Sequence, residues 1–216
     1  MNHLKSIFVV NRNFFIVFLL FFLSGLILLL TEGKADSFFL LNPYHRGFLN
    51  TFFIDFTFLG DGLFTVIVFV LFLCLRRFSQ AWQVITAFLA SALVAQILKS
   101  AFSLPRPKQL FASGQYSYFI EGVTHTGFAS FPSGHSTSIF ALVTLLALFE
   151  KNKKGNIAYL LAAVGVGYSR IYLGQHFLGD VLVGSLIGVS VAVLVHWLFV
   201  EKFPFFRRPV RSNTSV

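Results

Sequence analysis

The stretch SRIYLGQHFLGDVLVGSLIGVSVAVLVHWLF, residues 169–199, places three ionisable side chains directly before a long apolar run. The run 181–199 is long enough to form a membrane-spanning helix, which needs roughly 20 mainly apolar residues. Arg170, His176 and Asp180 therefore lie at the edge of a bilayer, where charged groups are costly unless an interaction partner holds them. This stretch predicts a helical membrane protein and raises the question of what that partner is.

The composition of the whole chain supports the same class. Of 216 residues, 56% are hydrophobic and 18% are aromatic, including 30 Phe, and the mean hydropathy is +0.78. These values lie outside the range of ordinary soluble domains. No repeat and no long polar linker divides the sequence, so we expect one membrane-embedded domain, residues 1–216. The predicted fold is an all-α bundle of six transmembrane helices, at about 13–30, 56–75, 82–98, 131–149, 157–172 and 181–199.

The formal net charge of +9 arises mainly from segments on one side of this topology. With the N-terminus inside, eleven of the 17 Lys and Arg residues are cytoplasmic: Lys5, Arg12, Arg76, Arg77, Lys151, Lys153, Lys154, Lys202, Arg207, Arg208 and Arg211. This asymmetry follows the positive-inside rule, so we predict that both termini are cytoplasmic. The run RRPVR, 207–211, is interpreted as a topology determinant beside anionic lipid, with a specific binding patch as the alternative. No nucleic-acid partner is expected.

Three polar islands remain that topology does not require. They are KSAFSLPRP, residues 99–107; FPSGHS, residues 131–136; and SRIYLGQHFLGD, residues 169–180. An even number of membrane crossings separates each island from the others. The sequence therefore predicts that all three lie on one membrane face, opposite the cytoplasmic termini.

In the third island, His176 and Asp180 are four residues apart, so on a helix they would share a face. The carboxylate could then accept a hydrogen bond from one ring nitrogen and leave the other free, as in the His–Asp pair of a hydrolytic triad. The alternative is a purely structural pair at the end of a span. Arg170 joins the pair only if the chain turns at Gly174, and we expect such a turn.

The second island resembles the start of a helix that binds an anion. Pro132 suits the first turn, and Ser133 and Gly134 have little side-chain bulk, so free backbone amides there can approach an anion closely. His135 adjoins these amides. The alternative is a Ser-Gly helix start with an interfacial histidine.

The first island adds two cations, Lys99 and Arg106, a point charge and a planar fork that both suit phosphate. Taken alone, they could be interfacial anchors. Together the islands supply three cations, amide donors, two histidines and one carboxylate. This set suits phosphoryl transfer without a metal, because a metal hydrolase would be expected to show more carboxylates.

The three motifs closely resemble the tripartite signature of the type 2 phosphatidic acid phosphatase superfamily, over about residues 50–200. The resemblance implies a six-helix fold, metal-independent removal of phosphate from lipid phosphates or diphosphates, and a phosphohistidine intermediate. Carried over to this chain, His176 is the nucleophile, Asp180 its orienting partner and His135 the general acid. The resemblance also implies a phosphate-binding set of Lys99, Arg106, Ser133, Gly134 and Arg170, and no cofactor.

We therefore expect a lipid phosphatase of the bacterial inner membrane with its active site facing the periplasm and no obligatory protein partner. Undecaprenyl diphosphate, phosphatidylglycerophosphate, phosphatidate and lipid A phosphate remain open as substrates, and the loop 108–130 is the expected selector. The alternatives are a phosphatase for soluble phosphate esters, a vanadate-dependent haloperoxidase and a non-hydrolytic phospholipid carrier. His45 and His125 are possible head-group contacts. Asp61 is expected to form a turn or helix cap, with an ion pair to an active-site cation as the alternative.

Overall fold

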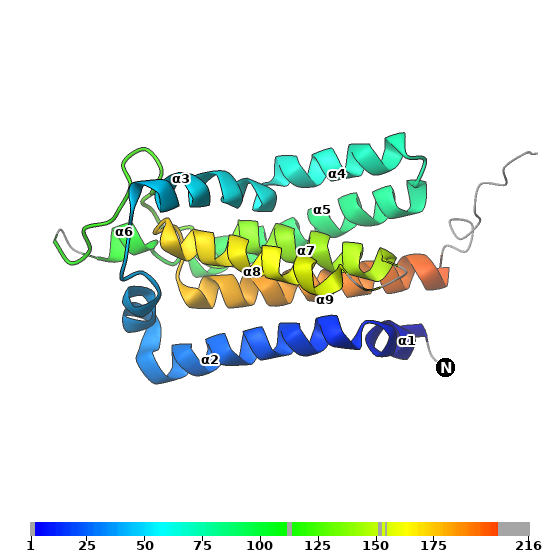
Figure 1. Ribbon diagram of the computed structural model, residues 1–216, viewed down its shortest axis with the longest axis horizontal. Helices are drawn as coiled ribbons and strands as arrows, with labels where there is room; N and C mark the ends of the chain where they lie inside the picture. Colours follow the sequence, from blue (N-terminus) through cyan, green and yellow to red (C-terminus); the bar gives the residue numbers. More distant parts are fainter. Residues whose placement is uncertain (1–2, 112–113, 151–152, 154, 203–216) are drawn as a thin grey trace, which may run out of the picture.

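The computed structural model describes residues 3–111, 114–150, 153 and 155–202, and this part of the chain is helical throughout apart from its loops (Figure 1). Among the described residues, seven helices have ten residues or more, and together they form the bundle. Shorter helices begin the chain, bridge a bend and follow the third span. In chain order the elements are α1 His3–Val10, α2 Arg12–Leu41, α3 Gly47–Phe56, η1 Thr57–Gly60, α4 Gly62–Cys74, α5 Phe78–Phe102, α6 Pro107–Leu110, α7 Gly134–Phe149, α8 Asn156–Tyr172 and α9 Leu178–Lys202.

Each predicted span coincides with a helical segment. Not every segment, however, is long enough to cross a membrane. Within the described residues three helical segments are long and apolar enough to cross a membrane: α2, the run from α5 to the end of α6, and α9. The second predicted span, 56–75, covers η1 and α4 but leaves out nearly all of α3. The segments 47–60 and 62–74 meet at 52° and count as a fourth span only if this bent pair is one span. The six-span count stays a prediction, since α7 is shorter than a full span.

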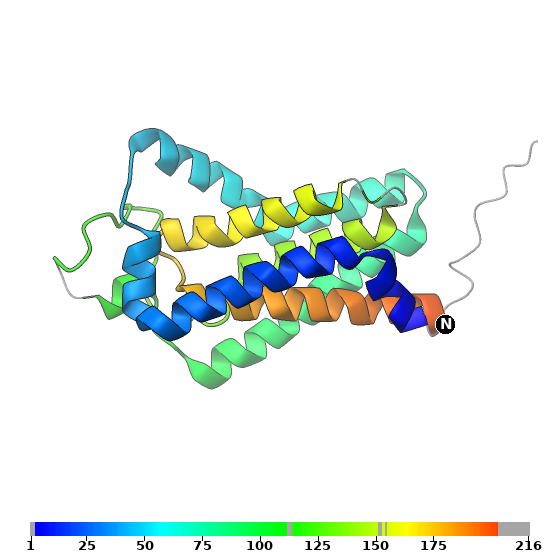
Figure 2. The ribbon, with the colours of Figure 1, turned by 60° about the horizontal axis from the view of Figure 1, so that its bottom comes forward.

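Apolar side chains on α2 face outward, as expected of a helix in lipid. Ile16, Leu20 and Ile27 are each more than half exposed, and a soluble protein rarely exposes so continuous an apolar surface. The opposite side of α2 lies across α8 and α9 (Figure 2). Gly33 interrupts the helical conformation with a φ of 79°, so the last turns of α2 change direction.

Close packing of α9 against α7 forms the centre of the bundle. A Cβ atom at Gly188 would lie 2.5 Å from the carbonyl oxygen of Thr137, and one at Gly184 would lie 2.7 Å from that of Ser133. Two glycines four residues apart thus let the backbones touch, as small residues do between membrane helices. The contact brings the start of α7 beside the start of α9, where two of the three predicted motifs lie.

The two ends of the bundle differ in what they carry. The motif segments at α6 and at the α8–α9 turn lie at one end, and the N-terminus and the end of α9 lie at the other (Figure 1). Several residues on which the predicted orientation rests lie outside the described residues: Lys151, Lys154 and the run 207–211. The assignment of the two ends to the cytoplasm and the periplasm stays a prediction.

Candidate active site

The turn between α8 and α9 places His176 beside Asp180. Gly174 has a φ of 63°, and the carbonyl oxygen of Arg170 accepts hydrogen bonds from the amides of Gln175 and His176. The predicted turn at Gly174 is therefore present. Nδ1 of His176 lies 3.5 Å from Oδ2 of Asp180, and both side chains are almost fully buried.

The pair forms in a different way from the one that its spacing suggested. His176 lies in the turn, because α9 begins only at Leu178, so the two residues do not share a helical face. Burial lowers the pKa of His176 to about 4, and the Asp180 carboxylate only partly offsets this. The imidazole is therefore neutral at pH 7, which is the form that can act as a nucleophile.

Three hydrogen bonds fix Asp180 itself. Its Oδ2 accepts from the Ser130 hydroxyl at 2.5 Å and from the Phe177 amide at 2.9 Å. The second bond is the backward reach of a capping box, because Asp180 is the third residue of α9 and Phe177 immediately precedes the helix. The carbonyl oxygen of Asp180 accepts from the Ser133 amide at 3.0 Å. The second motif thus holds the backbone of Asp180, and Ser130, directly before that motif, orients the carboxylate.

Helix α7 begins with Ser133 as its N-cap, whose hydroxyl oxygen accepts from the Ser136 amide. Pro132 lies before the cap and not in the first turn, contrary to the expectation from the sequence. The first amides of a helix have no partner within it, and a Cβ atom at Gly134 would meet nothing within 4 Å. The start of α7 thus combines free donors with open space, as an anion site requires.

The first motif approaches from α5 and the segment that follows it. Lys99 donates to the carbonyl oxygen of Ala129 at 2.9 Å. Arg106 donates from Nη1 to Oε1 of Gln175 at 2.8 Å and to the Gln175 carbonyl oxygen at 3.2 Å. Gln175 was not predicted as a site residue. It is buried and also donates to the carbonyl oxygen of Val123 in the long loop. The loop 108–130 is therefore anchored directly on the candidate site.

Arg170 is the buried cation of the site. Only 8% of its surface is exposed, and its Nη1 donates to the Thr57 hydroxyl at 2.9 Å. Its Nε makes no hydrogen bond within the described chain. A buried guanidinium with an unused donor is costly, so this geometry indicates a missing acceptor.

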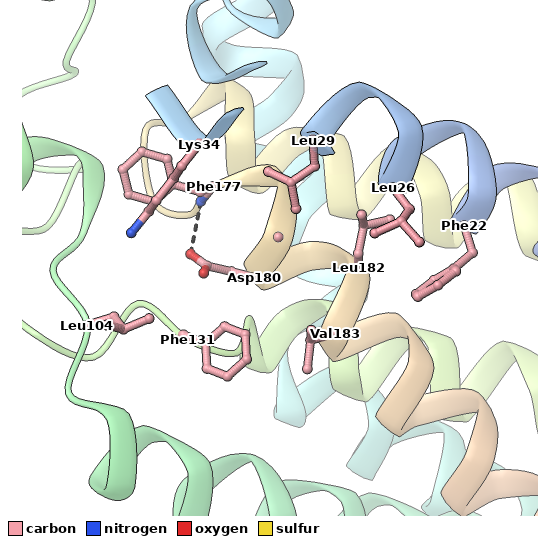
Figure 3. A pocket seen from close by; sticks show the side chains of 11 residues that line it. Phe22, Leu26, Leu29, Lys34, Leu104, Phe131, Phe177, Asp180, Leu182 and Val183 are labelled. Atoms are coloured by element: carbon pink, nitrogen blue, oxygen red, sulfur yellow. Dashed lines mark hydrogen bonds between the residues drawn. The ribbon is translucent and has the colours of Figure 1, made fainter. Parts of the chain in front are cut away.

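Two cavities adjoin these residues and differ in character. One, of about 230 Å³, is lined by Lys99, Gly134 and His135 together with residues of α4, α5 and α7. The other, of about 280 Å³, is almost entirely apolar and follows α2 from Phe22 towards Lys34, with Asp180 in its wall (Figure 3). Lys34 lies over the ring of Phe177 at 4.2 Å. A partly polar cavity and an almost entirely apolar one of similar volume thus lie next to the same motifs.

The two histidines proposed as head-group contacts lie in different surroundings. The ring of His45 is stacked between Tyr118 and Tyr172, and its Nε2 contacts the Tyr116 hydroxyl at 2.8 Å. His45 therefore ties the first loop to the long loop, and burial lowers its pKa. His125 is exposed in the long loop. A head-group contact of either residue stays a prediction.

Comparison with known proteins identifies the family. The sequence profile of the PAP2 superfamily matches residues 80–204, which include all three motifs. The chain therefore belongs to the PAP2 superfamily, the type 2 phosphatidic acid phosphatases, as its motifs indicate. The match does not include α3, η1 and α4.

Individual relatives agree with this assignment. The chain is 33% identical over 109 residues to the lipid A 1-phosphatase of Rhizobium johnstonii and 39% identical over 97 residues to phosphatidylglycerophosphatase B of Bacillus subtilis. The matches cover 50% and 40% of this chain, and less than half of the relatives' length, 43% and 46%.

Two solved structures share the fold over most of their length. Aquifex aeolicus LpxE has a TM-score of 0.68 at 29% identity, covering 76% of this chain and 94% of that one. A PAP2-type phosphatidylglycerolphosphate phosphatase from Bacillus subtilis has a TM-score of 0.65 at 26% identity, covering 87% and 96%. The helical arrangement described above is therefore that of membrane PAP2 proteins.

Replacing Gly134 by Ala tests whether an anion binds at the start of α7. The new methyl group meets no protein atom but occupies the space in front of the free amides, so folding should be unaffected and oxyanion binding weakened. Losing one charge-assisted hydrogen bond corresponds to about a tenfold or larger rise in the inhibition constant for vanadate. Gly47→Ala, at another open position, is the control, and an unchanged constant for Gly134→Ala would place the anion elsewhere.

Proposed function

We propose that this chain is a metal-independent lipid phosphatase that hydrolyses a phosphomonoester or diphosphate of a membrane lipid through a phosphohistidine intermediate. The observation that carries the proposal is the unpaired Nε of buried Arg170 beside the neutral His176. A phosphate bound there would supply the missing acceptor and bring phosphorus within reach of the imidazole. Lys99, Arg106 and the amides at Gly134 would complete the phosphate-binding set.

The roles follow from the surroundings of each histidine. His176 attacks phosphorus through its Nε2, because Nδ1 faces Asp180, and the bond from phosphorus to the lipid oxygen breaks. His135 borders the cavity that Lys99 and Gly134 also line, and it gives its proton to that leaving oxygen. Water then attacks the phosphohistidine, the phosphorus–nitrogen bond breaks, and the proton of the water returns to His135. Ser133 contributes by capping α7 and by holding Asp180 through its amide.

No metal takes part in the proposed reaction. The proposed reaction is also the same for each of the candidate lipids. The described residues contain no group of three or more His, Cys, Asp or Glu side chains that could hold a metal ion. Side-chain cations take the place of a metal in neutralising the equatorial oxygens of the phosphate.

The apolar cavity supports a lipid substrate over a soluble phosphate ester. Its wall is formed mainly by α2 and α9 and reaches from Phe22 to Lys34. An acyl or prenyl chain could therefore lie along the cavity, with its anionic head group near Lys34. The names of the relatives point to the same class, since they act on lipid A and phosphatidylglycerophosphate. Phosphatidate and undecaprenyl diphosphate are further candidates, and the anchored loop 108–130 would select among them.

The proposed setting is the bacterial inner membrane, with one catalytic domain over residues 1–216 and its signature core at about 50–200. The site would face the periplasm and both termini the cytoplasm. The separation of the motif segments from the N-terminus and the end of α9 supports their placement on opposite sides of the membrane (Figure 1), and the positive-inside rule supports the choice of side. The partners are the lipid phosphate and the surrounding membrane lipids, with no nucleic acid and no obligatory protein partner.

The direct test is phosphate release by the purified protein in detergent with EDTA, using a panel of lipid phosphates. We expect turnover of at least one lipid without added metal, and essentially none by His176→Ala, which should still bind lipid. A chain that binds lipid phosphates without hydrolysing any of them would be a carrier. Turnover that EDTA abolishes and magnesium restores would contradict the mechanism.

A larger side chain in the apolar cavity tests whether the substrate is a lipid or a soluble phosphate ester. Leu26 lines the cavity, whereas its neighbour Ile27 is 62% exposed. Leu26→Trp should lower kcat/KM for a long-chain lipid phosphate by about tenfold, the effect of losing a few buried methylene groups, and leave p-nitrophenyl phosphate nearly unaffected. Ile27→Trp is the matched control. Equal loss with both substrates would show that the cavity does not hold the lipid chain.

A further inference from the structure

The segment Thr57–Asp61, at the break between α3 and α4, packs directly on the candidate site. Thr57 accepts the hydrogen bond from Arg170. A Cβ atom at Gly60 would lie 3.0 Å from both Cβ and the carbonyl oxygen of His135, so this glycine lets the backbone approach the start of α7. The segment lies outside the part of the chain matched by the family profile, and none of the three motifs includes it.

The two carboxylate oxygens of Asp61 have different partners. Oδ1 accepts from the Leu63 amide at 2.8 Å and so caps α4. Oδ2 lies 3.9 Å from Nε2 of His135. Because the cap fixes one oxygen, the other is held towards the histidine. In the described part of the chain there are two ion pairs between a histidine and a carboxylate, and the proposed nucleophile and the proposed general acid each take part in one.

The charges around His135 explain why a carboxylate matters there. His135 is largely buried, and three cations lie around it: Lys99 of α5, Arg106 at the start of α6 and Arg170 of α8. Each positive neighbour disfavours a protonated imidazole, yet a general acid must carry a proton when the substrate binds. Asp61 supplies the opposite charge from the side of α4.

We propose that Asp61 is a positioning residue for the general acid, which stabilises the imidazolium form of His135; this inference rests on the proposed function. At 3.9 Å the contact is an ion pair and not a hydrogen bond. The carboxylate therefore favours the charge without taking the proton. As phosphorus bonds to His176, the proton of His135 passes to the leaving oxygen, and Asp61 stays ionised throughout.

Asp61→Asn isolates the charge, because Asn caps helices as well as Asp does and has nearly the same size. The wild type and the variant are compared on phosphatidate, which has a poor leaving group, and on p-nitrophenyl phosphate, which needs little protonation. With phosphatidate we expect kcat to fall by about tenfold or more, part of the 10²- to 10⁴-fold contribution of a general acid. The alkaline limb of the pH–rate profile should move to lower pH, since the imidazolium then loses its proton more readily. With p-nitrophenyl phosphate the rate should stay within about threefold.

Two further variants make the test specific. Asp55→Asn removes an exposed carboxylate on α3 and should behave as the wild type. Asp61→Ser also keeps a capping side chain without the charge, so it should reproduce the Asp61→Asn profile even if one of the two variants folds poorly. In a His135→Ala background, Asp61→Asn should cause no further loss, because both act through one proton transfer.

The outcomes distinguish this inference from the function on which it rests. Equal losses with both substrates, or an unshifted alkaline limb in an active wild type, would overturn the role of Asp61 and leave the proposed function standing. If phosphatidate is not hydrolysed, the comparison uses the lipid phosphate of the panel that is. A wild type that hydrolyses no lipid phosphate of the panel would overturn both.

Discussion

The architecture of the site depends on one constraint, a guanidinium held in a nearly dry interior. Arg170 is 8% exposed and its Nε has no partner in the described chain. Desolvating a cation is costly unless an acceptor compensates, and the surrounding cations make the local field still more positive. Around Arg170 the protein gathers free amides, Lys99 and Arg106, so the cost is offset only when an oxyanion binds. The same constraint would favour the binding of phosphate, as the proposed function requires.

The helix packing turns this constraint into geometry. Gly184 and Gly188 let α9 touch α7, and the contact allows the Ser133 amide to bond the carbonyl oxygen of Asp180. The carboxylate that faces the proposed nucleophile and the helix start that faces the proposed phosphate are therefore parts of one rigid unit. Sites supported by packed helices hold their side chains more accurately than sites on free loops. Gln175 anchors the loop 108–130 on this unit, which is why we propose that the loop selects the lipid.

The spacing of residues within each motif was enough to identify the motif residues. The predicted order of the helices was enough to predict that the three motifs lie at one end of the bundle. Apolar runs of the right length predicted where the helices lie, because a bilayer imposes that length. Spacing failed where the backbone leaves regular structure. His176 approaches Asp180 from a turn and not from a helical face, and Pro132 stands before the cap of α7. The run 56–75 began at the break itself, because α3 carries Asn50 and Asp55 and is less apolar than α4.

The supporting residues were beyond prediction for a different reason. Ser130, Gln175 and Thr57 are common polar residues whose partners lie 50, 69 and 113 positions away in the chain. No local pattern marks such contacts, since tertiary packing alone creates them. Asp61 was recognisable as a cap from the sequence LGDG, but its approach to His135 follows from the bend between α3 and α4.

The central claim is that phosphorus becomes bonded to His176. The most direct measurement is rapid quenching of the enzyme with a phosphorus-labelled lipid phosphate under conditions that preserve phosphohistidine, followed by peptide mapping of the label. The account predicts label on the peptide that contains His176 in the wild type, a larger amount when breakdown of the intermediate is slowed, and none in His176→Ala. Label on His135, or steady turnover with no covalent label at any time, would contradict it.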